Sequence, residues 1–486
     1  MYKISSLLVL LSIFTAGCRQ AKEKGPDPAS GIQANWTDEK QTVEGFGIAQ
    51  AGWADPLFSH FKREEVMEQL FGPTGLKLNI LRGEVFPHYW ENERDKDFNL
   101  DDPVDLPLTD SLFARRSDDL LRRGQLWVTR YAHDRYHVDK LLFSVWSAPA
   151  YMKTNGNVSG GELKPESYQA FADYLAAFYK AYRSAGLPPY AISPSNEPGY
   201  AAPWNSSLWT PEKMGEFITR YLGPAFQREQ IPARIVFGEN PFWSAASEQA
   251  AFVSSLAFVD QVLEQYPAVT EFPLIAAGHG YTLPDSYPAP KDSLLTPIVP
   301  FDEARQKGIP VWVTEISETG ALDTTITDGV KWAATFHEYL TAAGVNALIW
   351  WGGALPTTNN ESLVVLDPDR QGYRLAKRFH TFGNFTRYIP AGSIRIGTTA
   401  GATADSLLVS AYKNGKDFTL VAVNPTAREI RTTLRLDGAK MQGSLNRYLT
   451  DASGNWQPSP VEIGSTGTCP IVLPPSSVAT FTGKSE

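Results

Sequence analysis

Cysteine is nearly absent from this sequence, whose 486 residues include only Cys18 and Cys469. Two cysteines are too few for a cysteine-based zinc module or for the disulfide framework of a small secreted domain. Positive charge is also scarce, since 44 Lys and Arg stand against 53 Asp and Glu, a net charge of −9. Proteins that bind nucleic acids need the opposite balance, so we expect no nucleic-acid partner.

The motifs of several common enzyme classes are missing as well. The dinucleotide fingerprint GxGxxG fails because Gln50 follows Gly45-Phe46-Gly47 where glycine is required, and there is no GxxxxGK[ST] phosphate loop. The GxSxG elbow of serine hydrolases is absent. His133 and His137 lie four residues apart but lack the glutamate of HExxH, so a solvated helix face explains them better than a metal site.

The N-terminus has the features of a secretory signal. Residues 1–17 contain an early lysine, an apolar run from Leu7 to Phe14 and small residues before Cys18. This segment resembles a bacterial lipoprotein signal, which implies lipidation of Cys18, although Thr15 stands where that signal usually has leucine and plain secretion is the alternative. We expect residues 18–33 to be a polar tether, and the protein to be secreted and anchored by lipid, in the periplasm or at the cell surface.

The middle of the chain alternates short β-rich runs with longer helical stretches. One helical example is Pro165 to Ala185, where Tyr168, Phe171, Tyr174, Leu175 and Phe178 recur at intervals of three and four residues. Units of about 40 residues predict a closed (β/α)₈ barrel over residues 34–388, and an open doubly wound sheet is the alternative. The predicted strands are the Gly45 region, Leu76–Leu81, Lys140–Val145, Tyr190–Ser193, Arg234–Gly238, Leu274–Ala277, Val311–Thr314 and Ala347–Trp351.

The pattern changes near Ile389. Short β-rich runs separated by turn residues continue to the C-terminus, with no segment of helical period. Residues 389–486 therefore predict a small β-sandwich, to which the run before Gly45 could lend a strand.

Glutamates at the ends of predicted strands are the candidates for chemistry. Barrel enzymes carry catalytic groups at the C-terminal ends of their strands, and Glu197, Glu239 and Glu315 each follow a β-rich run. Glu197 and Glu315 are 118 residues apart, close to three units of about 40, which places them on strands four and seven. Two facing carboxyl groups are what the cleavage of a glycosidic bond requires, although a single glutamate of this kind could also bind ligand or cap a helix.

The contexts of these glutamates resemble glycoside hydrolase family 30, a family of retaining enzymes on (β/α)₈ barrels. The resemblance rests on SNEP around Glu197, WVTE ending in Glu315, EGFGIAQAGWA near the start, the Phe143 to Pro165 stretch and LWTPEKM. It implies that Glu315 is the nucleophile and Glu197 the acid and base. Since two carboxylates and water complete that chemistry, no metal or organic cofactor is implied.

The same resemblance implies roles for further residues. Asn196 would bond the sugar 2-hydroxyl, Arg82 would hold the nucleophile ionised unless it is an ordinary ion pair, and Tyr281 would lie beside the nucleophile. Glu239 is left with a binding or structural role. The walls and floor of the sugar site would come from tryptophans, which could also be core residues: Trp53, Trp146, Trp350 and Trp351.

The substrate class follows less directly. Glucuronoxylanases of the family carry an arginine after the eighth-strand tryptophans, but here Gly352-Gly353-Ala354-Leu355-Pro356 follows, with no basic residue before Arg370. We expect a β-linked plant-type glycan, xylan ahead of β-1,6-galactan or β-1,6-glucan, with an exo-β-glycosidase also open. A catalytically silent glycan-binding lipoprotein is the alternative from another class, and the oligomeric state stays open.

Overall fold

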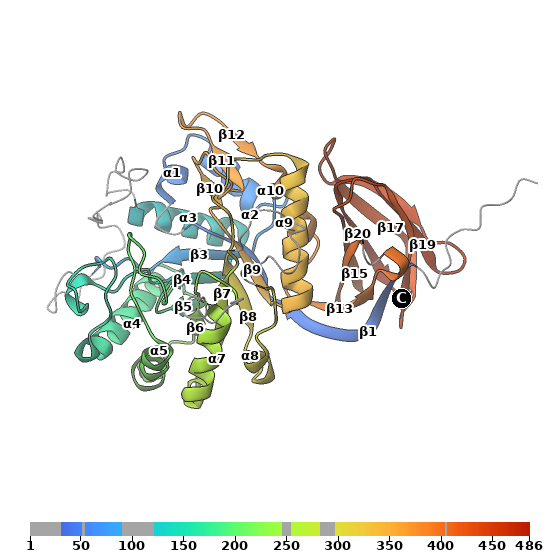
Figure 1. Cartoon of the computed structure of the whole chain (residues 1–486). Coiled ribbons are helices and arrows are strands. Elements are labelled where there is room, and N and C mark those ends of the chain that lie inside the picture. Colours follow the sequence, from blue (N-terminus) through green and yellow to red (C-terminus); the bar gives the residue numbers. More distant parts are fainter. Residues whose placement is uncertain (1–30, 51–53, 90–120, 245–253, 282–296, 404–405) are drawn as a thin grey trace, which may run out of the picture.

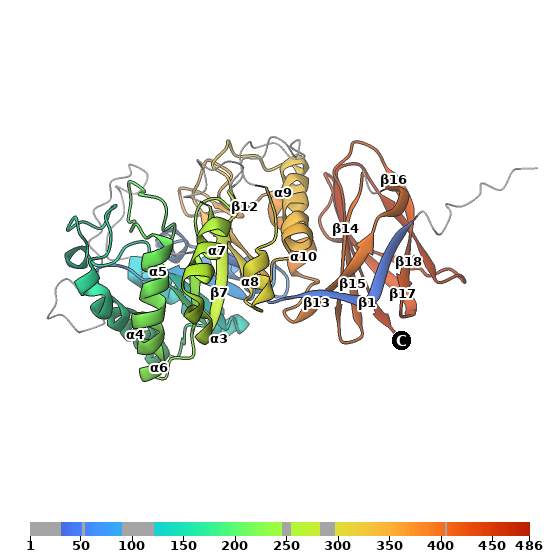
Figure 2. The same ribbon diagram turned by 60° about the horizontal axis from the view of Figure 1, so that its bottom comes forward.

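The structure is a computed structural model, and it describes residues 31–50, 54–89, 121–244, 254–281, 297–403 and 406–486. The expected signal peptide, Cys18, nearly all of the tether and Trp53 lie outside the described residues. A barrel with surrounding helices forms one part of the molecule, and a twisted sheet rich in C-terminal strands forms the other (Figures 1 and 2).

The barrel is closed by parallel strands. β2 pairs with β3 on one side and with β9 on the other, which completes the ring and excludes the open doubly wound sheet. Within the described residues the ring has eight strands in chain order: β2 (Gly45–Ala49), β3 (Ile80–Glu84), β4 (Lys140–Ser144), β5 (Ala191–Ser193), β6 (Arg234–Gly238), β7 (Leu274–His279), β8 (Val311–Glu315) and β9 (Ala347–Trp351).

β3 begins four residues later than its apolar run predicts. Leu76 and Leu78 are buried before the strand, whereas Arg82 lies inside it, fully buried. A charged residue ends an apolar run in the sequence, but here buried carboxylates compensate its charge, so the strand continues past it.

Helices cover the outside of the barrel. The predicted helix around Phe171 is α4, and the five aromatic and leucine residues that define its period are all buried. A π-helical turn, Ile218–Leu222, joins α5 to α6. The helices are α1 (Ala54–Phe58), α2 (Arg63–Phe71), α3 (Leu121–Tyr136), α4 (Tyr168–Ser184), α5 (Pro211–Phe217), α6 (Gly223–Arg228), α7 (Ser255–Gln265), α8 (Asp302–Gln306), α9 (Ile326–Glu338) and α10 (Lys377–Thr386).

The second part of the molecule is one hydrogen-bonded sheet. Its order is β18-β17-β20-β15-β14-β13-β1-β16-β19, and its end strands β18 and β19 contact each other, so the sheet curls around its own apolar core. The free thiol of Cys469 is buried in that core. The strands are β1 (Ile32–Val43), β13 (Ser393–Thr399), β14 (Leu408–Asn414), β15 (Asp417–Asn424), β16 (Ile430–Asp437), β17 (Met441–Thr450), β18 (Gln457–Glu462), β19 (Thr468–Leu473) and β20 (Ser477–Ser485).

The two parts are packed against each other. β1, the run before Gly45, pairs with β13 and β16 in the C-terminal sheet, and the chain then enters the barrel at β2. α9 and α10 lie between the barrel and that sheet, where α10 contacts β17 and β20 (Figure 1). A small sheet of β10 (Ala354–Leu355), β11 (Val364–Leu366) and β12 (Tyr373–Leu375) follows β9. Among the described residues, no helix combines the length and apolar character of a membrane span.

Candidate active site

Glu197 and Glu315 lie at the same end of the barrel. Glu315 is the last residue of β8, the seventh barrel strand, and Glu197 comes four residues after the end of β5, the fourth. This is the placement that their spacing predicts. Because the strands are parallel, their C-terminal ends meet at one mouth, and both carboxyl groups are brought there.

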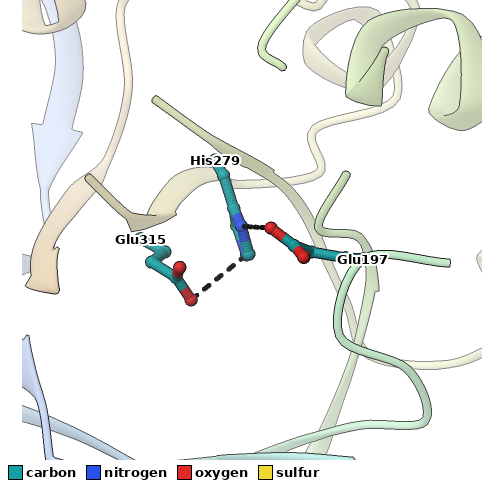
Figure 3. A group of neighbouring side chains, drawn as sticks. All are labelled: Glu197, His279 and Glu315. Atoms are coloured by element: carbon teal, nitrogen blue, oxygen red, sulfur yellow. Dashed lines mark hydrogen bonds and ion pairs between the residues drawn. The ribbon is translucent and has the colours of Figure 1, made fainter. Parts of the chain in front are cut away.

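His279 lies between the two glutamates (Figure 3). Its Nδ1 is 3.2 Å from Glu197 Oε1, and its Nε2 is 3.8 Å from Glu315 Oε2. One carboxylate oxygen of each glutamate and one ring nitrogen lie within 4.8 Å of one another. Carboxyl groups about 5 Å apart suit attack by one of them on a sugar, whereas a mechanism with a water between them needs about 6.5–9.5 Å.

His279 is not among the site residues that the sequence predicts. Its signal was present, since it closes the β-rich run that precedes Tyr281, but one histidine among seven carries little information by itself. Burial lowers the pKa of His279 below its usual value, although the Glu315 charge opposes that shift. A neutral ring has one donor and one acceptor nitrogen, so it can share a hydrogen bond with Glu197 without adding a positive charge beside Glu315.

Arg82 holds one side of the site together. Its side chain is fully buried, and it donates to Glu315 Oε2 at 2.7 Å, to Glu239 Oε1 at 3.2 Å and to Asn196 Oδ1 at 2.7 Å. Since one guanidinium serves two buried carboxylates, this is more than an ordinary ion pair. The bond to Oδ1 also fixes the Asn196 amide, so that its NH₂ group is the donor it can offer a ligand.

The two central carboxyl groups have different surroundings. Burial raises the pKa of Glu197 to about 7, with Arg82 lowering it and the Glu239 charge raising it further. Glu315 instead accepts hydrogen bonds from Arg82 and from the Tyr281 hydroxyl. Glu197 therefore keeps its proton to a higher pH than an ordinary glutamate does, while Glu315 faces a full positive charge.

Glu239 belongs to the same network. Burial alone would raise its pKa, but the Arg82 charge and hydrogen bonds from Ser193 and Thr314 help to hold the pKa below its usual value. Its backbone oxygen accepts a hydrogen bond of 3.0 Å from the Glu197 N–H. Both glutamates have left-handed backbone angles, with φ of 47° at Glu197 and 46° at Glu239. Non-glycine residues rarely adopt such angles, and sites of chemistry are where the strain is commonly kept.

The tryptophans divide between two environments. Trp146 and Trp351 lie in the inner cluster of the barrel with ring centroids 6.1 Å apart, and Arg82 lies 4.8 Å over the Trp146 ring. The prediction for Trp350 is wrong: this side chain is fully buried and packs against Trp332 under α9. Successive residues of a strand point to opposite faces, so Trp350 and Trp351 cannot both face the barrel mouth.

The glutamates and His279 also offer three ligand atoms to a metal ion. Arg82 argues against that use, because its positive charge lies 2.7 Å from a Glu315 carboxylate oxygen and would repel a cation bound beside it. The donor set therefore fits proton transfer and nucleophilic attack better than metal binding.

Comparisons with known proteins place this chain in a family. The sequence model of O-Glycosyl hydrolase family 30 matches residues 118–365, about half of the chain. "Glucuronoxylanase XynC" of Bacillus subtilis is 24% identical over 464 residues, which cover 93% of this chain and 92% of that protein.

Solved structures share the fold. The catalytic domain of GH30 xylanase C from Talaromyces cellulolyticus superposes with a TM-score of 0.74 at 24% identity, covering 93% of this chain and 99% of that one. The endo-β1,6-glucanase BT3312 gives a TM-score of 0.68 at 17% identity, with 93% and 94% covered.

Proposed function

Since this chain belongs to glycoside hydrolase family 30 and is a glycosidase, we propose that it is a retaining β-glycoside hydrolase acting by double displacement. The observation that carries the proposal is that one carboxylate oxygen of Glu197 lies within 4.8 Å of one of Glu315, in surroundings that suit an acid and a nucleophile. Membership of the family implies that a glycosidic bond is cut. The geometry of the two glutamates supports the proposal that it is cut by double displacement.

The proposed steps use these side chains in turn. Glu315 attacks the anomeric carbon and forms a glycosyl ester, while Glu197 gives its proton to the departing glycosidic oxygen. Glu197, now a carboxylate, then takes a proton from water, and the hydroxide oxygen displaces Glu315 from the sugar. Arg82 and Tyr281 orient Glu315, and the Asn196 NH₂ group binds the 2-hydroxyl of the reacting sugar.

We propose xylan as the substrate, ahead of β-1,6-galactan, β-1,6-glucan or an exo-acting β-glycosidase role. Similarity to a glucuronoxylanase along most of both chains supports xylan, and the endo-β1,6-glucanase neighbour keeps the alternative open. The absence of a basic residue between Trp351 and Arg370 argues against recognition of an acidic branch.

A substrate screen tests the proposal. Xylan, glucuronoxylan, β-1,6-galactan, β-1,6-glucan and aryl β-glycosides are incubated with the enzyme, and product lengths are recorded. The configuration of the first product is read by NMR before mutarotation. We expect hydrolysis with a β-configured first product. An α-configured product would contradict retention, and a wild type that binds glycan but cleaves none of these substrates would favour the silent binding protein.

We also propose the expected export and domain layout: cleavage after residue 17, lipidation of Cys18, a tether to residue 33, and a β-sandwich formed by the C-terminal sheet. The lipoprotein-like signal supports this proposal. Cys18→Ala in the full chain should move the protein from the membrane fraction to the soluble fraction. Membrane association that survives this substitution would contradict lipidation.

A further inference from the structure

Two exposed aromatic side chains lie on the loop that follows Glu197, and the proposed mechanism does not use them. Tyr200 is 40% exposed and Trp204 is 42% exposed, and among the described residues only Phe61 is another large hydrophobic side chain with such exposure. Their rings meet edge to face, with centroids 6.2 Å apart and planes at 71°. Aromatic side chains with no core to pack against are suited to contact the apolar C–H face of a sugar ring.

The loop brings this pair next to the leaving group. The Tyr200 N–H donates to the Glu197 carbonyl oxygen at 2.9 Å, which closes a tight turn and keeps the two Cα atoms within about 7 Å. Under the proposed mechanism, Glu197 protonates the oxygen that leaves with the departing sugar. The departing sugar must therefore lie on the Glu197 side of the broken bond, where the loop that carries Tyr200 and Trp204 begins.

Ser206 ties this loop to the loop after β4. Its N–H donates to Val158 O at 3.0 Å, its hydroxyl accepts from Gly160 N at 2.9 Å, and that hydroxyl donates to Ala202 O at 2.9 Å with Trp204 O also near, at 3.2 Å. The Ser206 carbonyl also accepts from Lys153 Nζ at 2.5 Å. The main chain that carries Trp204 is thus held in place before any ligand binds.

Lys153 is the buried centre of this connection. Its ammonium is fully buried and donates to Ser147 Oγ at 2.9 Å, to Val158 O at 3.1 Å and to Ser206 O. Burying an ammonium among neutral acceptors is costly, and burial lowers the pKa of Lys153 to about 7. Through these three bonds, Lys153 joins the loop after β4 to the loop that carries Trp204 and holds their relative position.

We propose that Tyr200 and Trp204 form a leaving-group subsite, an aromatic platform that binds the sugars on the reducing-end side of the bond that Glu197 protonates. This inference rests on the proposed function. It means that the enzyme prefers substrates whose leaving group is itself a sugar chain. It also means that an acceptor sugar can occupy the platform in the second step. Its hydroxyl oxygen then bonds to the anomeric carbon, the ester bond to Glu315 breaks, and Glu197 takes the hydroxyl proton.

The test compares two leaving groups on one glycone. Full-length Trp204→Ala and Tyr200→Ala are assayed on xylan and on 4-nitrophenyl β-xylobioside, whose leaving group is not a sugar. If the screen identifies β-1,6-glucan instead, that polysaccharide and 4-nitrophenyl β-gentiobioside replace them. We expect kcat/KM to fall about fivefold to tenfold on the polysaccharide, mainly through KM, and less than twofold on the aryl glycoside. Phe61→Ala, which removes a ring with 73% exposure from another loop, is the matched control and should leave the ratio unchanged.

Two further readouts separate the possible outcomes. Transfer to added xylobiose, measured with the aryl glycoside as donor, should fall with Trp204→Ala. Lys153→Met, a positioning variant, should show the same polysaccharide-selective rise in KM while the protein stays folded by circular dichroism. Equal losses on both substrates, or no loss on the polysaccharide, would overturn the platform while leaving the proposed function intact. A wild type inactive on every glycan and aryl glycoside of the substrate screen would overturn both.

Discussion

The pKa of Glu197 makes a quantitative prediction about the pH dependence of hydrolysis. The proposed acid works only when protonated, and burial raises its pKa to about 7. Above that pH the protonated fraction falls about tenfold per pH unit, so kcat/KM at pH 9 should be roughly a hundredfold below its plateau. The assay is kcat/KM against pH on a substrate with a sugar leaving group, which depends on protonation of the departing oxygen.

Two variants decide whether Glu197 is the source of this alkaline limb. Glu197→Ala, assayed on a 2,4-dinitrophenyl glycoside whose leaving group needs no proton, should lose the limb. Glu239→Gln removes the negative charge that raises the pKa of Glu197 and leaves the Arg82 charge less compensated, so the limb should move to lower pH. Glutamine preserves the shape of the side chain, and a melting curve checks that the variant is folded. A limb that persists in Glu197→Ala, or that stays in place in Glu239→Gln, would refute this reasoning.

Three further predictions concern the nucleophile and the buried framework. Glu315→Gln should lower kcat by roughly 10⁴-fold or more while glycan binding, followed by affinity electrophoresis, is retained; near-normal turnover would show that another group attacks the sugar. Trp350→Ala should cost about 3–5 kcal/mol in urea unfolding because it empties a core position beside Trp332, and a loss below about 1 kcal/mol would contradict that packing. Arg378→Met should cost about 3–5 kcal/mol, since it leaves the buried Asp328 carboxylate without the bond of 2.8 Å that it accepts from Arg378, and an unchanged unfolding midpoint would show that the pair contributes nothing.

Local pattern was enough to predict much of the barrel. β6 and β9 have the predicted bounds, and α4 buries the predicted residues, because burial on one side of an element repeats with the period of that element. β3 shows where this fails. Its strand passes through Arg82, whose charge is compensated by carboxylates that lie more than 150 residues further along the chain.

The candidate site also contains residues that the sequence predicts and residues that only the fold reveals. Glu197 and Glu315 could be predicted because strand ends and spacing are properties of the sequence. His279 could not be, because its role depends on both glutamates reaching it from other strands. Trp350 and Trp351 could not be separated either, since the sequence shows two adjacent tryptophans but not which face of β9 points into the barrel.

In the sequence alone, the near absence of cysteine and the acidic balance excluded disulfide frameworks and nucleic-acid binding. The alternating β-rich and helical segments determined a barrel with carboxylates at its strand ends. Only the tertiary structure decided their environments: which carboxyl group has its pKa raised by burial, which bonds directly to Arg82, and which aromatic rings remain exposed on the loop after Glu197. The physical reason is that a pKa and a binding surface depend on desolvation and on neighbouring charges. Those neighbours come from strands that are distant in sequence and adjacent only when the barrel closes.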